Sequence, residues 1–126
     1  MTFTEEVQSV CEHAFSILRL KRLKFRPMRR TRAVNPGRGF VIGRTNLKTG
    51  LITIDIFTPR KREPKKISSV LRTLCHEIAH HQKKPYRQLF KGKIINRQHY
   101  PGFYRQVKKN VAKLKKDSTL KPYFDL

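Results

Sequence analysis

The stretch LRTLCHEIAHHQKK, residues 71–84, contains three of the five histidines of this 126-residue chain, and a glutamate stands between the first two of them. Apolar residues recur through the stretch at spacings of three and four, which predicts an amphipathic helix that Pro85 ends. On a helix, residues four apart lie one above the other. His76 and His80 therefore project from one face and can reach the same metal ion.

Glu77 follows His76 directly and is turned about 100° away from it around the helix axis. It can flank a metal ion without binding it, which is the arrangement that a zinc hydrolase needs. In such enzymes two imidazoles and a third protein ligand hold the ion, and a water molecule with a pKa of about 7 takes the open position. A carboxylate at Glu77 can take the proton of that water and pass it to the leaving amine. The alternative is a helix whose polar face is simply solvated.

A third ligand is the next requirement, and one histidine remains downstream of the motif, His99 in NRQHYPGFYRQV. No glutamate follows Glu77 in the chain, so a downstream glutamate ligand is excluded. Asp117 is the nearest downstream carboxylate and is the weaker alternative. His81 points about 100° round the helix from the ligand pair, so we expect it at the surface or beside the ligands. We expect Cys75 to be a buried thiol.

The motif HEIAH at 76–80, followed by a loop and by HYPGF (99–103) at the start of a helix, resembles the SprT-like zinc metallopeptidases, the family that includes bacterial SprT and the Spartan proteases. The resemblance covers most of the chain, because the order of helix, strands, active-site helix and closing helix is also similar. It implies a compact zincin-like fold, a Zn²⁺ ion bound by His76, His80 and His99, and Glu77 as the general base. It also implies hydrolysis of peptide bonds in proteins trapped on DNA.

The remaining pattern predicts an α+β fold in a single domain that spans residues 1–126. A capping box at Thr2 and Glu5 opens an N-terminal helix, and Pro64 suits the first turn of the motif's helix. Alternating isoleucines in GLITIDIFT mark a strand, which the resemblance places at the sheet edge that substrate uses. The expected elements are a helix over 2–20, a small sheet of about three strands near 23–27, 39–45 and 50–58, the motif's helix over 64–84, a loop or short helix over 85–98, and a closing helix over 101–116.

Charge is the most unusual property of the composition, because 30 Lys and Arg face 8 Asp and Glu and give a formal net charge of +22. Such a field attracts polyanions, with nucleic acid the first candidate and an anionic membrane the second. The plain alternative is a solvated surface that only keeps the protein soluble. DNA contact has to come from the domain itself, with exposed aromatic side chains stacking on bases. The candidate residues are Arg29, Arg30, Arg32, the 60–66 cluster, Lys83, Lys84, the lysines of 105–116, Tyr86, Phe90, Tyr100 and Tyr104.

Two cysteines without a CxxC pair argue against a disulfide framework and favour a reducing compartment. The first residues lack the pattern of a signal peptide, and no apolar run approaches the roughly 20 residues of a membrane span. We therefore expect a soluble intracellular monomer, cytoplasmic or nuclear, that acts on a protein or peptide substrate and has no membrane partner.

Two functions from different classes remain open. The first is a zinc endopeptidase that acts on proteins bound to nucleic acid. The second is a non-catalytic nucleic-acid-binding module, in which a structural zinc only joins the motif's helix to the loop at His99. Glu77 discriminates between them, because a structural site does not need a carboxylate beside the metal and is usually closed by four protein ligands. The three good ligands of this sequence favour the enzyme.

Overall fold

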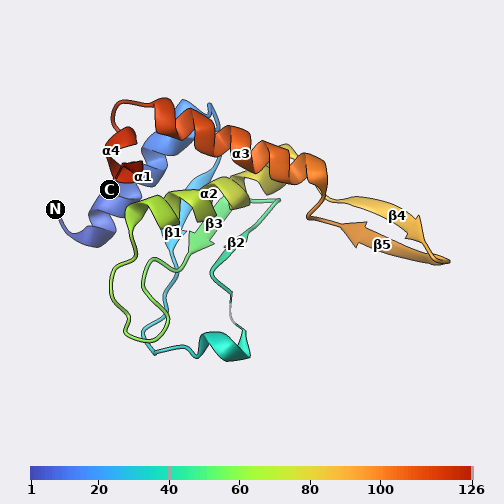
Figure 1. Cartoon of the computed structure of the whole chain (residues 1–126), viewed down its shortest axis with the longest axis horizontal. Helices are drawn as coiled ribbons and strands as arrows, with labels where there is room; N and C mark the ends of the chain where they lie inside the picture. Colours follow the sequence, from blue (N-terminus) through green and yellow to red (C-terminus); the bar gives the residue numbers. More distant parts are fainter. Residues whose placement is uncertain (40, 126) are drawn as a thin grey trace.

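The computed structural model describes residues 1–39 and 41–125 and shows an α+β fold in which helices cover one face of a small sheet. The elements in chain order are α1 (Phe3–Ile17), β1 (Lys24–Pro27), the 3₁₀ turn η1 (Pro36–Arg38), β2 (Gly43–Thr45), β3 (Leu51–Ile54), α2 (Ile67–Gln82), β4 (Tyr86–Phe90), β5 (Lys93–Arg97), α3 (Pro101–Lys116) and α4 (Lys121–Phe124). Helix α2 contacts β2 and β3 on one side and α3 on the other, so it lies in the middle of the molecule (Figure 1). The motif's helix is therefore the element against which the other α-helices and strands β2 and β3 pack.

The hydrophobic core lies where α1 and α2 meet the covered face of the sheet. Ile52, Ile54 and Ile56 have no exposed surface, as their alternation predicts. Cys75 is also fully buried and is a free thiol, which confirms the prediction for this residue. The buried stripe of α2 consists of Val70, Leu71, Leu74, Cys75 and Ile78. Most of the predicted stripe is therefore buried against the sheet and the neighbouring helices.

The main sheet has β3 at its centre, with β1 parallel to it on one side and β2 antiparallel on the other. The expectation that GLITIDIFT forms a sheet edge is therefore wrong. The strand also ends at Ile54 rather than near residue 58, because the buried side chain of Asp55 turns towards a cluster of partly buried cations. The free antiparallel edge is β2, which is shorter than the predicted strand over 39–45. Phe40 of that prediction lies outside the described residues.

Helices α1 and α2 begin or end a few residues away from their predicted limits. The capping box of α1 is present as predicted, since Thr2 Oγ1 accepts from Glu5 N–H and the Glu5 carboxylate accepts from Thr2 N–H. The helix ends at Ile17, before a turn in which Arg19 has a φ of 57° and Leu20 N–H donates to Phe15 O. Helix α2 begins at Ile67 rather than at Pro64, because Pro64 forms a β-bridge with Phe57.

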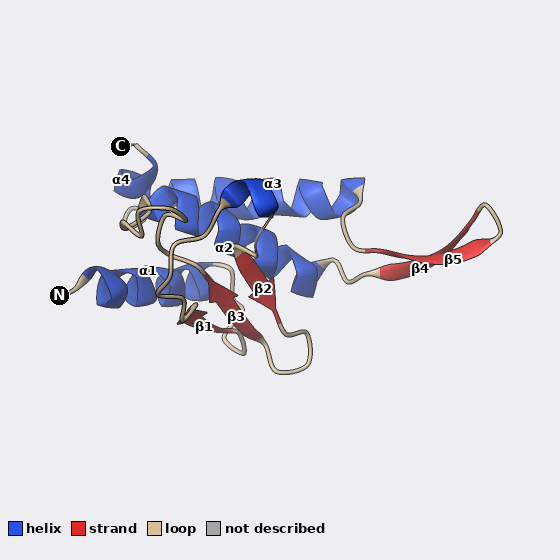
Figure 2. Cartoon of the chain, turned by 90° about the horizontal axis from the view of Figure 1, so that it is seen from below, coloured by secondary structure: helices blue, strands red, loops and turns tan. Residues whose placement is uncertain are grey.

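Residues 85–98 form an antiparallel hairpin, so the prediction of a loop or short helix there is wrong. Strands β4 and β5 are joined by a two-residue turn, in which Lys91 and Gly92 have φ values of 52° and 77°. Positive φ at both positions is the geometry of a type I′ turn, whose twist suits a hairpin. Figures 1 and 2 show the hairpin extending away from the packed helices.

The closing helix α3 has the predicted limits, and the short helix α4 that follows it was not predicted. Phe103 and Leu114 of its predicted apolar face are fully buried. In the part of the chain that the structure describes, no helix combines the length and apolar character needed to cross a membrane.

Candidate active site

Three histidines from two parts of the chain converge beside α2. His76 and His80 lie one turn apart on that helix, and His99 lies in the short link between β5 and α3. One ring nitrogen of each residue lies within 4.8 Å of the corresponding nitrogens of the other two. The ring centroids are 5.2 Å apart for His76 and His80, 5.2 Å for His76 and His99, and 5.0 Å for His80 and His99. The structure therefore brings together the three residues that the sequence predicts as metal ligands.

The donor chemistry of this cluster fits a zinc ion. Burial, and then the neighbouring His99 ring, lower the pKa of His76. Burial and the neighbouring imidazoles lower the pKa of His80 to about 4. Both rings are therefore neutral near pH 7, which leaves a nitrogen lone pair free for a metal. Three histidine ligands with one open position form the ligand set of a catalytic zinc.

Phe103, in the first turn of α3, lies against all three rings. Its centroid is 4.9 Å from His76, 4.5 Å from His80 and 5.1 Å from His99, and the residue has no exposed surface. A rigid aromatic ring in that place limits how the imidazoles can turn. The resemblance included Phe103 in the HYPGF motif but assigned it no role at the histidines. The available signal was its position four residues after His99, at the start of a helix.

Glu77 lies in the same cavity as the histidines. The cavity has a volume of about 360 Å³, and its lining includes His76, Glu77, His80 and His99. Glu77 is only 7% exposed, and this burial raises its pKa to about 7. A dication at the histidines would lower that pKa again. The carboxyl group is thus placed where it can hold or release a proton near neutral pH.

Edge strand β2 approaches Glu77 closely because residue 43 is glycine. A Cβ at Gly43 would lie 3.3 Å from Glu77 Oε1 and 3.1 Å from Thr73 Cγ2, which is tighter than ordinary contact. Thr45, two residues after Gly43 in the same strand, hydrogen-bonds through Oγ1 to His81 Nε2. His81 is buried rather than at the surface, and it joins α2 to the edge strand beside His80.

A buried amide fixes α3 against α2. Asn110 Nδ2 donates to Cys75 O at 3.3 Å and to Gln82 Oε1 at 2.7 Å. Because His99 immediately precedes α3, these bonds also help to fix where the third histidine lies. This role could not be predicted, since one asparagine among lysines on a helix has the pattern of an exposed residue.

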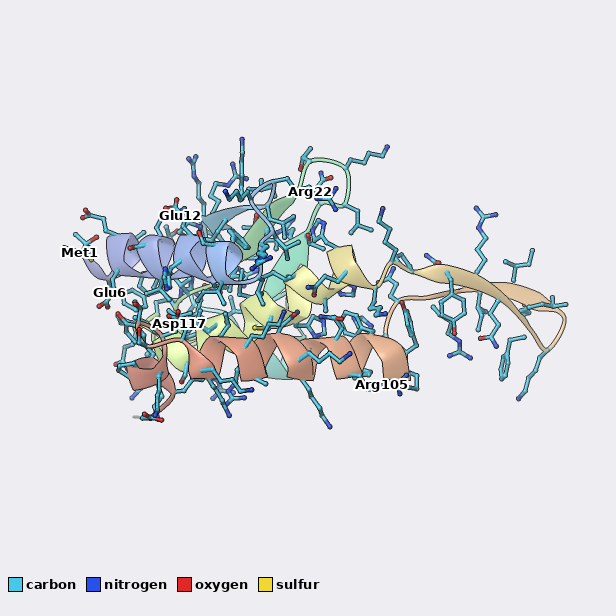
Figure 3. All side chains as sticks on the ribbon, turned by 90° about the horizontal axis from the view of Figure 1, so that it is seen from above. Met1, Glu6, Glu12, Arg22, Arg105 and Asp117 are labelled. Carbon is cyan, nitrogen blue, oxygen red and sulfur yellow. The ribbon has the colours of Figure 1, made fainter. Side chains whose placement is uncertain are left out.

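Asp117, the alternative third ligand, does not lie at this site. Its carboxylate pairs with His13 Nε2 at 2.9 Å, where α1 meets the end of α3. Figure 3 shows Asp117 near the opposite end of α3 from Arg105, which is in the first turns of that helix. Asp117 therefore joins two helices of the fold and is remote from the histidines.

Comparisons with known proteins found one similar structure. No family model matches the chain, and no curated protein matches it. Among solved structures, the chain is similar to "Crystal structure of the metallopeptidase zymogen of Pyrococcus abyssi abylysin", with 24% sequence identity and a TM-score of 0.47. The match covers 94% of this chain and 89% of that chain. Similarity at this level carries no argument about function, which therefore rests on the residues of the site.

Proposed function

We propose that this chain is a zinc-dependent metallopeptidase of the SprT-like type. The observation that carries the proposal is the meeting of three imidazole nitrogens within 4.8 Å of one another, in a cavity that also contains the shielded carboxyl group of Glu77. His76, His80 and His99 would hold the metal. Zinc in such a site supplies a Lewis acid and an activated water molecule.

Glu77 supplies the proton transfers. Burial raises its pKa to about 7, and a dication at the histidines would lower it again, so the carboxylate form that accepts a proton would be present at neutral pH in the metal-loaded site. The glycine at position 43 lets the edge strand, and a substrate paired with that strand, lie close to the carboxyl group. Burial also removes competing bulk water from around the carboxyl group, which strengthens its interaction with a reacting group.

Strand β2 offers a place for an extended substrate. Ile42 O accepts from Asp55 N–H, and Asn46 N–H donates to Leu51 O, so these two residues turn their polar backbone groups towards β3. By the alternation of an antiparallel pair, Gly43 and Thr45 turn theirs towards the free edge. A peptide can add to that edge as a further strand, beside Glu77 and the histidines. This assigns to β2 the role that the resemblance gave to GLITIDIFT.

A structural zinc is the competing function, and the ligand count argues against it. Closed structural sites usually have four protein ligands, often cysteines. Among the described residues the group of potential ligands at this site contains three histidines and no cysteine. The nearest cysteine in sequence, Cys75, is fully buried, and burial raises the pKa of its thiol to about 12. The open fourth position and Glu77 both support catalysis.

We propose further that the substrates are proteins held on nucleic acid. DNA is the nucleic acid with which this is to be tested. A cavity of about 760 Å³ lies on the exposed face of the sheet, and its lining includes Arg26, Arg29, Arg44 and Lys48. Arg44, Thr45 and Leu47 line this cavity and also the cavity at the histidines. Four cations in one groove suit a phosphate backbone. If a polyanion bound in this groove, a protein attached to it would lie next to the cavity that contains Glu77 and the histidines.

The deciding experiment is Glu77→Gln, with zinc content and cleavage of a casein-like protein measured on the same preparation. The substitution keeps the shape of the side chain and removes the base. We expect one zinc per chain and a rate about 10²- to 10⁴-fold lower. Glu63→Gln makes the same chemical change at an exposed loop residue and should keep full activity.

His99→Ala tests the metal assignment separately. Losing one of three imidazoles should remove stoichiometric zinc under mild chelation, while the buried core and the α2–α3 bonds remain. Zinc retained by His99→Ala would exclude this residue as a ligand. Full cleavage by Glu77→Gln would instead support the non-catalytic module.

A further inference from the structure

Hairpin β4–β5 presents apolar side chains that the fold does not use. In the described part of the chain its two strands contact each other, and no other helix or strand packs on them. Leu89 and Ile94 are each 72% exposed, while Tyr86 and Phe90 are about half exposed. Tyr100 supports only the base of the hairpin, through its ring contact with Tyr86. Exposed apolar residues gathered on a projecting element indicate a surface that meets a partner.

The two faces of the hairpin combine apolar and positive groups. Leu89 pairs with Ile94 across the strands, and Arg87 lies on the same face two residues earlier. On the other face, Lys91 Nζ and the Arg97 guanidinium lie 5.4 Å and 5.5 Å from the centroid of the Phe90 ring. No Asp or Glu occurs between Glu77 and Asp117, so no acid neutralises these cations locally in sequence. A complementary partner must therefore carry negative charges together with apolar groups.

From this surface we infer that β4–β5 binds an acidic, extended polypeptide segment that contains aliphatic residues. Aliphatic side chains such as Leu89 and Ile94 pack against other aliphatic groups, whereas bases bind by stacking on aromatic rings. Each strand also has one edge without a neighbouring strand among the described residues, and such an edge accepts an added strand. The inference rests on the proposed function, because it assigns the segment to protein substrates of the same site.

Three other occupants fit this surface less well. A second copy of the chain would bring another net charge of +22 against the same cations. A membrane would require the apex, Lys91-Gly92-Lys93, to carry two ammonium groups into the bilayer. Single-stranded nucleic acid would satisfy the cations but leave the Leu89 and Ile94 pair without apolar contact. The groove on the sheet, which is lined by Arg26, Arg29, Arg44 and Lys48, is also a better site for nucleic acid.

The base of the hairpin leads to the histidines. A cavity of about 320 Å³ at that base is lined by Tyr86, Gln88, Arg97, His99, Tyr100 and Pro101. His99 also lines the cavity that contains Glu77. A segment held along the hairpin would therefore continue towards the cleft, and the hairpin would select substrates by residues outside the scissile region.

Binding is measured on the zinc-loaded Glu77→Gln protein, so that cleavage does not interfere. The probe is a fluorescent peptide in which Glu alternates with Leu or Val, and its counterpart has Lys in place of Glu. We expect the peptide with Glu to bind and the peptide with Lys not to bind. The double variant Leu89→Ser/Ile94→Ser should weaken that binding about tenfold or more, because both side chains lose apolar burial. Lys91→Gln/Lys93→Gln should weaken it and flatten its salt dependence.

The matched control is Lys113→Gln/Lys116→Gln, which removes the same charge at the far end of α3 and should leave peptide binding unchanged. Equal losses in the control and the hairpin variants would overturn the inference, since general charge would then explain binding. A single-stranded oligonucleotide, or vesicles rich in phosphatidylserine, are the alternative probes. If hairpin variants weaken binding to one of these and the acidic peptide does not bind, the hairpin contacts nucleic acid or membrane and the inference is wrong.

The second measurement is cleavage by hairpin variants that keep Glu77 and the three histidines. Hairpin variants should raise KM for a long substrate with an acidic segment and leave kcat unchanged. They should not alter cleavage of a short peptide that spans only the cleft. Unchanged KM for the long substrate would refute the inference while leaving the peptidase intact. Absence of any cleavage by the wild type would refute the proposed function, and the binding result would still decide what the hairpin binds.

Discussion

Asp55 shows how a single buried charge organises the segment that leads into α2. Its side chain has no exposed surface and accepts hydrogen bonds from Arg62 at 2.9 Å and from Arg30 at 3.0 Å, while Lys65 Nζ donates to its backbone oxygen at 2.8 Å. Burial acts to raise the pKa of Asp55, but the bonds from Arg62 and Phe57 N–H, with the charges of Arg62 and Lys65, hold it below its usual value. The loop over 57–66 is therefore held by a charged cluster rather than by packing alone.

Asp55→Asn should destabilise the protein by about 3–5 kcal/mol at pH 7, because it leaves buried cations without their counter-charge. The pKa of Asp55 is lowered in the folded state, so its stabilising effect is present above the unfolded value of about 3.9 and is lost as pH falls through the folded pKa. Urea unfolding should thus show a larger difference between variant and wild type at pH 7 than at about pH 3, because the loss begins as pH falls below the unfolded pKa. Asp125→Asn, at an exposed position, serves as the control. An equal difference at both pH values would contradict this account.

The packing of β2 against α2 determines the shape of the cleft. Both elements contribute to the lining of the cavity, and the absence of a side chain at Gly43 allows their close approach. A second cavity, of about 580 Å³, lies on the other side of this contact and includes Ile42, Arg72 and Thr73 in its lining. Substrate lying along β2 would therefore have space on both sides of Glu77.

Gly43→Ala should reduce activity about ten- to hundredfold and leave zinc content unchanged, because its Cβ would push Thr73 or Glu77 out of position. Adding Thr73→Ser removes the methyl group that would lie 3.1 Å away, and the double variant should recover part of the loss. The measurements are kcat on a casein-like substrate and metal analysis. Wild-type activity in Gly43→Ala would mean that the carboxyl group tolerates displacement, and would weaken its assignment as the base.

The sequence predicted the long helices and the strands at 24–27 and 51–54, because their apolar periods are regular and their caps are local. It did not predict the hairpin of β4 and β5, whose exposed faces lack the usual apolar–polar alternation and whose turn uses lysine rather than asparagine before Gly92. The three histidines could be proposed as ligands from spacing and resemblance. The bonds of Asn110 and His81 could not, nor could the contact of Phe103 with all three rings, because each depends on which helix or strand lies opposite.

Positive charge is unevenly distributed over the whole molecule. Residues 78–116 contain 12 Lys and Arg and no acid, whereas three of the eight acids, Glu5, Glu6 and Glu12, lie on α1. Of the remaining acids, Asp55 is paired with arginines and Glu77 is shielded in the cleft. The α1 end of the molecule is therefore the less positive one, and Figure 3 shows Glu6 and Glu12 there, with Asp117.

Binding to duplex DNA should fall steeply with salt, by about 0.9 in log K per unit of log salt for each phosphate contacted. Arg26→Gln/Arg29→Gln/Lys48→Gln should reduce that slope, because these residues line the groove on the sheet. A variant with the same change of charge on α3 should reduce the slope less. That variant is Lys108→Gln/Lys109→Gln/Lys113→Gln. Fluorescence anisotropy at several salt concentrations provides the measurement. A flat salt response of the wild type would contradict nucleic-acid binding altogether.

We expect the same excess of positive charge to slow the binding of a metal ion to the three histidines. A zinc ion must approach the histidines against the repulsion of a chain with a net charge of +22, and Arg44 lines the cavity that it enters. Salt screens such repulsion, with a Debye length of about 8 Å at 0.15 M. The association rate constant of zinc, followed by stopped-flow fluorescence, should therefore rise with ionic strength while DNA affinity falls. An anionic zinc complex should load the site faster than the hydrated ion does, so the chemical form of the metal would decide how soon a newly folded chain becomes active.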